Sequence, residues 1–135
     1  MDVARATDIK AKRGPAEWFT GTVWIMPVPH PAATIGFGAA WVTFEPGART
    51  AWHTHPRGQT LYVVSGAGRL QKRGGPLQVI GPGDSVWIEP GLEHWHGAAP
   101  DSIMVHLAIQ EAEDGVTVTW LDPVSDADYR GAPAP

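Results

Sequence analysis

The spacing of the histidines is the first feature of this sequence that suggests chemistry. Five of the six histidines lie between residues 53 and 106, and four form two pairs, His53 with His55 and His94 with His96. Residues i and i+2 of a strand share a face, so each pair presents two imidazoles on one side. Imidazole is the commonest protein ligand for Zn, Mn, Fe, Ni and Cu. The pairs therefore predict a site for one divalent metal ion.

The elements that must position these residues are short strands. Period-2 runs bounded by Gly and Pro are typical of strands, and they occur at residues 22–26, 38–44, 50–55, 60–65, 68–73, 76–80, 85–88, 94–97, 102–110 and 116–121. Gly74-Gly75 indicates a hairpin. Many short strands at regular spacing predict an all-β fold, a sandwich or barrel, in a single domain of residues 1–135. Residues 125–135 are expected to form a short helical turn and then a frayed, partly disordered tail.

Alternation along the strands assigns further residues to the pocket. His106 and Gln110 share one face of their strand, and apolar residues fill the opposite face. Ala40 and Val42 form a similar row on an earlier strand. Thr50 has the opposite parity to His53 and His55, so its role in the pocket depends on a β-bulge. His30 stands alone between two prolines and is expected in a loop.

Gln59 and the tryptophans complete the assignment of side chains. Gln59 follows a Pro-Arg-Gly turn, where a hairpin reversal would return its amide oxygen toward His53 and His55. Strand alternation places the tryptophans of the central strands on the face opposite to the metal ligands. This position favours packing between sheets or subunits. They are Trp41, Trp52, Trp87 and Trp95.

Composition excludes several classes of function. The chain has no Cys, which excludes disulfides, thiolate zinc sites and Cys nucleophiles. The net charge is −4 and the basic residues are scattered, which argues against a nucleic-acid partner. Residues 1–14 lack the apolar segment of a signal peptide, and no apolar run approaches the roughly 20 residues of a membrane helix. We expect a cytoplasmic protein that acts on a small molecule, with no membrane partner.

Two spacings resemble the motifs of the cupin family. Gly47, His53, His55, Gln59 and Gly66 match the first motif, which normally carries Glu where this chain has Gln59. Gly83, Glu89, Gly91 and His94 match the second motif, which usually has Pro at the position of Glu89 and Asn at that of Ala98. The resemblance covers about residues 36–110 and implies a double-stranded β-helix, or jelly-roll barrel. It also implies one metal ion held by His53, His55, Gln59 and His94, and a homodimer or homotetramer.

The charge of these ligands carries further information. Three neutral imidazoles and a neutral amide leave the ion its full double positive charge, whereas Glu would cancel part of it. Such an ion favours an anion such as an alkoxide, a carboxylate or cyanide. Mn²⁺ and Fe²⁺ suit mixed nitrogen and oxygen ligands, and the sequence does not choose between them or exclude Zn²⁺ and Ni²⁺.

A closer resemblance is to the manganese-dependent cupin hydroxynitrile lyases. It is carried by residues 45–56, 58–60, 94–100 and 106–111, and by 14–23 near the N-terminus. These enzymes cleave a cyanohydrin such as (R)-mandelonitrile to an aldehyde and hydrogen cyanide, and run the reverse addition. The resemblance implies Mn²⁺ as the ion and His96 and His106 as pocket histidines. Ala40 and Val42 would line the pocket of the aryl group.

Several alternatives remain open at this level. His96 is either a fifth ligand or, as we favour, a general base whose pKa is depressed beside the ion. His106, or protonated His96, would then stabilise the departing cyanide. A quercetinase-like metal-dependent dioxygenase and a non-catalytic small-molecule-binding cupin are the other two functions compatible with the motifs.

Overall fold

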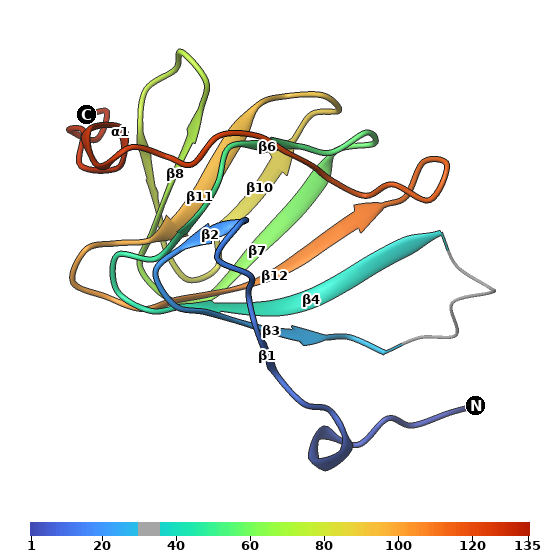
Figure 1. Ribbon diagram of the computed structural model, residues 1–135. Coiled ribbons are helices and arrows are strands. Elements are labelled where there is room, and N and C mark those ends of the chain that lie inside the picture. Colours follow the sequence, from blue (N-terminus) through green and yellow to red (C-terminus); the bar gives the residue numbers. More distant parts are fainter. Residues whose placement is uncertain (30–35) are drawn as a thin grey trace.

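Two antiparallel sheets form the body of the computed structural model, which describes residues 1–29 and 36–135 (Figure 1). The six-stranded sheet runs in the order β1 (Lys12–Arg13), β3 (Val23–Pro27), β4 (Phe37–Phe44), β12 (Met104–Glu111), β7 (Gln59–Gly66) and β10 (Ser85–Ile88). The second sheet runs β13 (Thr119–Trp120), β6 (His53–Thr54), β11 (His94–Ala98), β5 (Arg49–Thr50) and β2 (Phe19–Thr20). Two further strands extend it, because β8 (Gly68–Lys72) pairs with β11 and β9 (Gln78–Ile80) pairs with β8.

The all-β expectation is confirmed. The strands sit within a few residues of the predicted runs, and β8 and β9 form the hairpin that Gly74-Gly75 indicated. The late strand β12 lies between β4 and β7, so segments far apart in the sequence become neighbours, as in a jelly roll. Two short helices complete the elements of the described residues, η1 (Ala6–Asp8) and α1 (Asp126–Tyr129). No helix among the described residues is long and apolar enough to cross a membrane.

The run predicted at 50–55 is two strands and not one. The backbone leaves the ladder at Ala51 and Trp52, whose N–H groups donate to Trp18 O (2.7 Å) and Asp122 O (2.9 Å). This break separates β5 from β6 and resets the alternation between them. Thr50 and His53 therefore both face the space between the sheets, although they have opposite parity.

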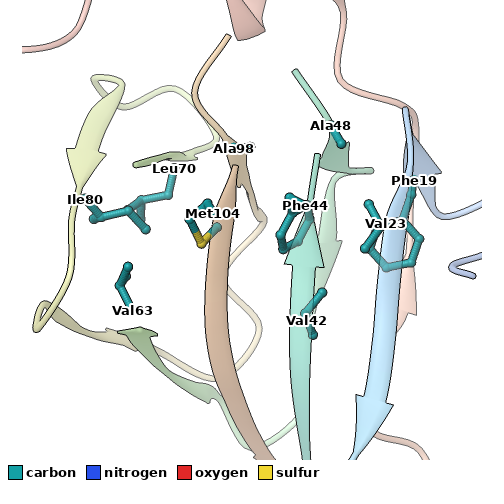
Figure 2. Packing of buried hydrophobic residues seen from close by; sticks show 10 residues of the cluster. All are labelled: Phe19, Val23, Val42, Phe44, Ala48, Val63, Leu70, Ile80, Ala98 and Met104. Atoms are coloured by element: carbon teal, nitrogen blue, oxygen red, sulfur yellow. The ribbon is translucent and has the colours of Figure 1, made fainter. Parts of the chain in front are cut away.

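An apolar core fills one end of the space between the two sheets. Figure 2 shows its ten buried residues, which are Phe19, Val23, Val42, Phe44, Ala48, Val63, Leu70, Ile80, Ala98 and Met104. Full burial of each large apolar side chain contributes about 1.5–3 kcal/mol. Along β12 this core begins at Met104, and His106 and Gln110 follow on the same face. The core thus closes the barrel beneath the histidines.

The C-terminal segment begins with the short helical turn that the sequence suggested, and in the structure this turn and the residues around it contact the barrel. Ser125 caps α1 by accepting from the Asp128 N–H, and the Tyr129 ring is buried with its hydroxyl donating to Ala98 O at 2.7 Å. The buried Arg49 guanidinium donates to Val124 O (2.9 Å). Further on, Ala134 N donates to Leu77 O at 2.8 Å. These partners come from distant strands, so the local composition of the tail does not reveal them.

The four tryptophans expected to pack between sheets or subunits lie in two different environments. Trp52 and Trp95 are buried in a second cluster with Tyr129, on the side of the second sheet away from the histidines. Trp87, in contrast, is 59% exposed on the outside of the first sheet. Trp41 is half-buried on the same outer face.

Candidate metal centre

A cavity of about 150 Å³ opens between the sheets above the apolar core. Most of the residues assigned to the site from the sequence line it, namely His53, His55, Gln59, His96, His106, Ala40, Val42, Thr50 and Gln110. His94 is not part of the lining, but its ring lies beside that of His53 with the centroids 4.1 Å apart. His30, expected in a loop, lies outside the described residues.

Three histidines are held in the same way by backbone carbonyls. Each Nδ1 hydrogen-bonds to one oxygen, His53 to Ala51 O (2.9 Å), His55 to Thr117 O (2.7 Å) and His94 to Leu92 O (2.8 Å). A carbonyl only accepts, so each Nδ1 carries the proton and each Nε2 keeps its lone pair. Nε2 of His55 and of His94 are buried without a hydrogen-bond partner in the described structure. A histidine anchored through one nitrogen, with the other free to bind, is typical of metal ligands.

Gln59 offers an oxygen to the same space. Its amide nitrogen donates to Gln110 Oε1 at 3.1 Å, which fixes the orientation of the amide. Gln59 Oε1 is then buried and has no partner among the described residues. A buried amide oxygen without a donor is costly unless something satisfies it, and a cation does so.

His96 and His106 form a pair of a different kind. His96 Nδ1 lies 3.1 Å from His106 Nε2, so one imidazole donates and the other accepts. The second nitrogen of each ring, His96 Nε2 and His106 Nδ1, is buried without a partner in the described structure. Thr50 Oγ1 accepts from the His96 backbone N–H at 3.2 Å, which ties β11 to β5 at this point.

Distance and hydrogen bonding select overlapping sets of ligands. The nitrogen atoms of His53, His94 and His96 lie within 4.8 Å of one another, and this group is able to hold a metal ion. The carbonyl bonds instead select His53, His55 and His94. The hydrogen bonds are the stronger indication of a ligand, because they fix which nitrogen has a lone pair, whereas proximity only limits which atoms can converge. Both sets fit a divalent ion bound by neutral nitrogen atoms.

Burial keeps all five histidines of the site neutral. Burial, followed by the charge of neighbouring imidazoles, lowers the pKa of His53 and of His96 well below the usual value. Burial also lowers the pKa of His94 and of His106 to about 4, and it lowers that of His55. At neutral pH the site thus presents lone pairs and no positive charge that would repel a cation.

The aromatic wall of the cavity was missed by the sequence analysis. Phe19 from β2 and Trp120 from β13 line the cavity, and the Trp120 ring lies 4.8 Å from that of His53. Trp18 stacks on the outer side of Trp120 with 5.3 Å between the ring centroids. Phe19 lies in a strand of two residues, which has no detectable period, and the only signal for it was the aromatic pair Trp18-Phe19 between Pro15 and Gly21. Trp120 lies in the run predicted at 116–121, but that run alone did not show which of its faces meets the cavity.

Comparisons with known proteins show the family of the chain. The cupin domain family matches residues 40–110, which include every histidine of the site. Over 133 residues the chain is 55% identical to a protein of Granulicella tundricola named (R)-mandelonitrile lyase, and the match covers 96% of this chain and 99% of the lyase. The similarity therefore extends beyond the cupin motifs to the segments of Phe19 and Trp120.

Solved structures give the same result for the fold. A cupin-like protein from Thermotoga maritima superposes with a TM-score of 0.85 at 38% identity, over 96% of each chain. The polyketide cyclase RemF from Streptomyces resistomycificus superposes with a TM-score of 0.70 at 21% identity, over 96% of this chain and 90% of the cyclase, a likeness that concerns the fold alone. The family match and these relatives show that this chain belongs to the cupin family.

Proposed function

We propose that this chain is a hydroxynitrile lyase. It cleaves cyanohydrins of the (R)-mandelonitrile type to an aldehyde and hydrogen cyanide, and it catalyses the reverse addition. The observation that carries this proposal is the 55% identity over 96% of the chain to the (R)-mandelonitrile lyase of Granulicella tundricola. The cavity with its paired histidines supplies the groups that the reaction needs.

Four residues are proposed to hold a divalent metal ion, Mn²⁺ in the first instance. They are His53, His55, Gln59 and His94, whose buried nitrogen and oxygen atoms are described above. When bound there, such an ion would supply positive charge next to a substrate hydroxyl group and would so lower the pKa of that hydroxyl. Because all four ligands are neutral, none of that charge is cancelled by the protein.

His96 is proposed as the base that takes the hydroxyl proton. With Nδ1–H donating to His106 Nε2, His96 Nε2 carries the lone pair that accepts this proton. His106 stabilises the resulting imidazolium through the same hydrogen bond. The O–H bond pair becomes the second C–O bond as the C–C bond breaks, and the electrons of the C–C bond leave with cyanide. Cyanide then takes the proton back from His96 Nε2, so hydrogen cyanide departs and His96 is neutral again.

The aryl group of the substrate is proposed to occupy the apolar part of the cavity. Ala40 and Val42 line one wall, and Phe19 and Trp120 line another. A cavity of about 150 Å³ is large enough for a benzene-sized ring. Small side chains at positions 40 and 42 leave this room, since larger residues there would fill it.

The deciding experiment combines elemental analysis with an activity assay. Purified protein is analysed for bound metals, and cleavage of racemic mandelonitrile is followed by cyanide release with and without a chelator. The proposal predicts close to one manganese per chain and cyanide release that chelation abolishes and Mn²⁺ restores. Bound metal without cyanide release would reject the lyase function, and oxygen uptake with phenolic substrates would then be measured.

A further inference from the structure

The wall of the cavity contains an indole N–H that has no acceptor. Trp120 of β13 lines the cavity, and its Nε1 is buried without a hydrogen-bond partner in the described structure. A buried tryptophan N–H usually finds a partner, and a buried donor that lacks one costs free energy. A molecule bound in the cavity is therefore the natural source of the missing acceptor.

Neighbouring rings hold the Trp120 indole in place and offer its N–H no acceptor. Trp18 stacks on it with 5.3 Å between the ring centroids, and Phe19 meets it edge to face at 5.7 Å. Neither of these two rings has a lone pair in its plane that could accept a hydrogen bond. The His53 ring lies 4.8 Å away, but its Nδ1 donates to Ala51 O and its Nε2 is assigned to the metal ion.

Trp120 Nε1 is chemically unlike the proposed metal-binding atoms of the site. Gln59 Oε1 and the Nε2 atoms of His55 and His94 are also buried without a partner in the described part of the chain. All three offer lone pairs, which suit a cation, whereas an indole nitrogen can only donate. Their exposed surface is as small as that of Trp120 Nε1, so burial does not set the indole apart from the site.

His106 offers the other N–H in this part of the barrel. Its Nε2 accepts from His96 Nδ1 in the tautomer described above, so His106 Nδ1 carries a hydrogen. This nitrogen makes no hydrogen bond of good geometry in the described structure, but the backbone of His106 itself lies close enough to oppose the lowering of the pKa by burial. Trp120 Nε1 is thus the donor that the chain leaves entirely to a ligand.

A cyanohydrin carries one acceptor that the proposed site has not yet used. The metal ion and His96 are assigned to its hydroxyl group, and the apolar walls are assigned to its aryl group. The nitrile nitrogen remains, with a lone pair that accepts a hydrogen bond. As the C–C bond breaks, this nitrogen shares the negative charge of cyanide, so a donor bound to it stabilises the transition state more than the neutral substrate.

We propose that Trp120 Nε1–H binds the nitrile nitrogen of the substrate and makes the cavity selective for nitriles. This inference deepens the proposed function and rests on it for the identity of the ligand. The indole neither gains nor loses a proton. With the nitrogen of cyanide held by Trp120, the lone pair that C–C cleavage leaves on carbon is free to take the proton from His96 Nε2, which yields hydrogen cyanide.

Two probes of nearly the same shape isolate this contact. Phenylacetonitrile carries a nitrile, and propargylbenzene carries a terminal alkyne in its place, without the nitrogen lone pair. Isothermal titration calorimetry of the wild-type protein is expected to show about three- to tenfold tighter binding of the nitrile, which corresponds to one neutral hydrogen bond. Trp120→Phe keeps an aromatic ring but has no N–H, so it should bind both probes equally.

A control variant and a metal-free sample exclude other sources of the preference. Trp24→Phe should keep the preference for the nitrile, because Trp24 Nε1 donates to Glu45 Oε1 (3.4 Å) on an exposed side chain that does not line the cavity. A nitrile can also bind a metal ion, so the titrations are repeated after chelation. A preference that survives chelation supports the Trp120 contact. A preference that chelation abolishes, or one that Trp120→Phe keeps, would overturn it.

A spectroscopic measurement covers the case in which Trp120→Phe does not fold. The chain has seven tryptophans, and their indole N–H protons give separate resonances in nuclear magnetic resonance spectra. In the metal-free wild type, one of these resonances should move downfield with phenylacetonitrile and not with propargylbenzene. If none does so, or if phenylacetonitrile does not bind to the wild type at all, the proposal is wrong.

Kinetics separate this inference from the proposed function. In a lyase, Trp120→Phe should raise KM for mandelonitrile about three- to tenfold and lower kcat about tenfold, because the hydrogen bond to cyanide is stronger than the bond to a neutral nitrile. A wild type that prefers the nitrile probe but releases no cyanide would reject the lyase function and keep the Trp120 contact. Cyanide release by a wild type without the preference would reject the Trp120 contact alone.

Discussion

Gln59 and Gln110 are joined along one wall of the pocket by an amide–amide hydrogen bond of 3.1 Å, in which Gln59 Nε2 donates to Gln110 Oε1. The two residues are also direct cross-strand partners on β7 and β12. The bond uses the nitrogen of Gln59 and leaves its oxygen buried and without a partner in the described structure. A carboxylate, which the first cupin motif normally carries at this position, has no hydrogen to donate to Gln110 Oε1.

Truncation of these amides is expected to weaken metal binding to different degrees. Gln59→Ala removes a proposed ligand and should weaken Mn²⁺ binding more. Gln110→Leu removes only the side chain that orients Gln59, and it should lower the affinity for Mn²⁺ by about 10- to 100-fold. Affinity for Mn²⁺ is measured by competition with a chelator, and Gln78→Ala, on the exposed strand β9, serves as the control. Full metal occupancy and affinity in Gln59→Ala would contradict the four-ligand site.

Loss of the proposed base is expected to separate catalysis from metal binding. His96→Ala should lower kcat for mandelonitrile cleavage by about 10²–10⁴-fold while the metal content stays at one ion per chain. His106→Phe removes the hydrogen bond to His96 Nδ1 and should lower kcat less, because the base itself remains. If metal is lost from His96→Ala together with activity, His96 is a ligand, as its proximity to His53 and His94 allows.

The aromatic wall is expected to set the affinity for aryl substrates. Trp120→Ala removes a ring that lines the cavity. It should raise KM for mandelonitrile about three- to tenfold, which corresponds to the usual free energy of one aromatic contact. Trp18→Ala is the control, since Trp18 stacks on Trp120 but does not line the cavity. Steady-state kinetics on both variants distinguishes the two roles. Equal changes in KM would show that only the stacked pair as a whole matters.

The buried histidines make the metal-free protein sensitive to acid. Burial lowers the pKa of His94 and His106 to about 4, whereas unfolded histidine titrates near 6.5. Below pH 6.5 the unfolded chain therefore binds protons that the folded chain does not, and stability falls as the pH drops toward 4. Each such histidine contributes up to about 1.4 kcal/mol per pH unit. Thermal unfolding after chelation should show a lower midpoint at pH 5 than at pH 7, with a smaller difference in His106→Phe.

The part of the site that the sequence predicts depends on short-range spacing. His53 with His55, and His94 with His96, are separated by one residue, and strand alternation alone places each pair on one face. Gln110 and His106 follow by the same rule on one long strand. These relationships survive small errors in the strand ends. The structure accordingly brings His53, His55, His96, His106 and Gln110 to one cavity and places His94 beside His53.

The remaining features depend on contacts that have no local signal. Trp120 reaches the cavity through a strand of two residues, whose position is set by pairing with His53. Thr50 reaches it because the ladder breaks at Ala51 and Trp52, and the bonds that hold this break come from Trp18 and Asp122. The periodicity of a short stretch of sequence predicts neither a partner that is distant in the sequence nor a break in the strand.

The C-terminal segment offers a test of one such distant contact. Tyr129→Phe keeps the ring under the Arg49 guanidinium, which lies 4.4 Å from its centre, but removes the hydroxyl that donates to the buried Ala98 O. The carbonyl is left without this donor, so the free energy of unfolding should fall by about 1–2 kcal/mol. Urea denaturation measures the change. Tyr62→Phe, a loss of the same hydroxyl at a 46% exposed position, should leave stability nearly unchanged. A tail that frays in solution would instead make both variants equal to the wild type.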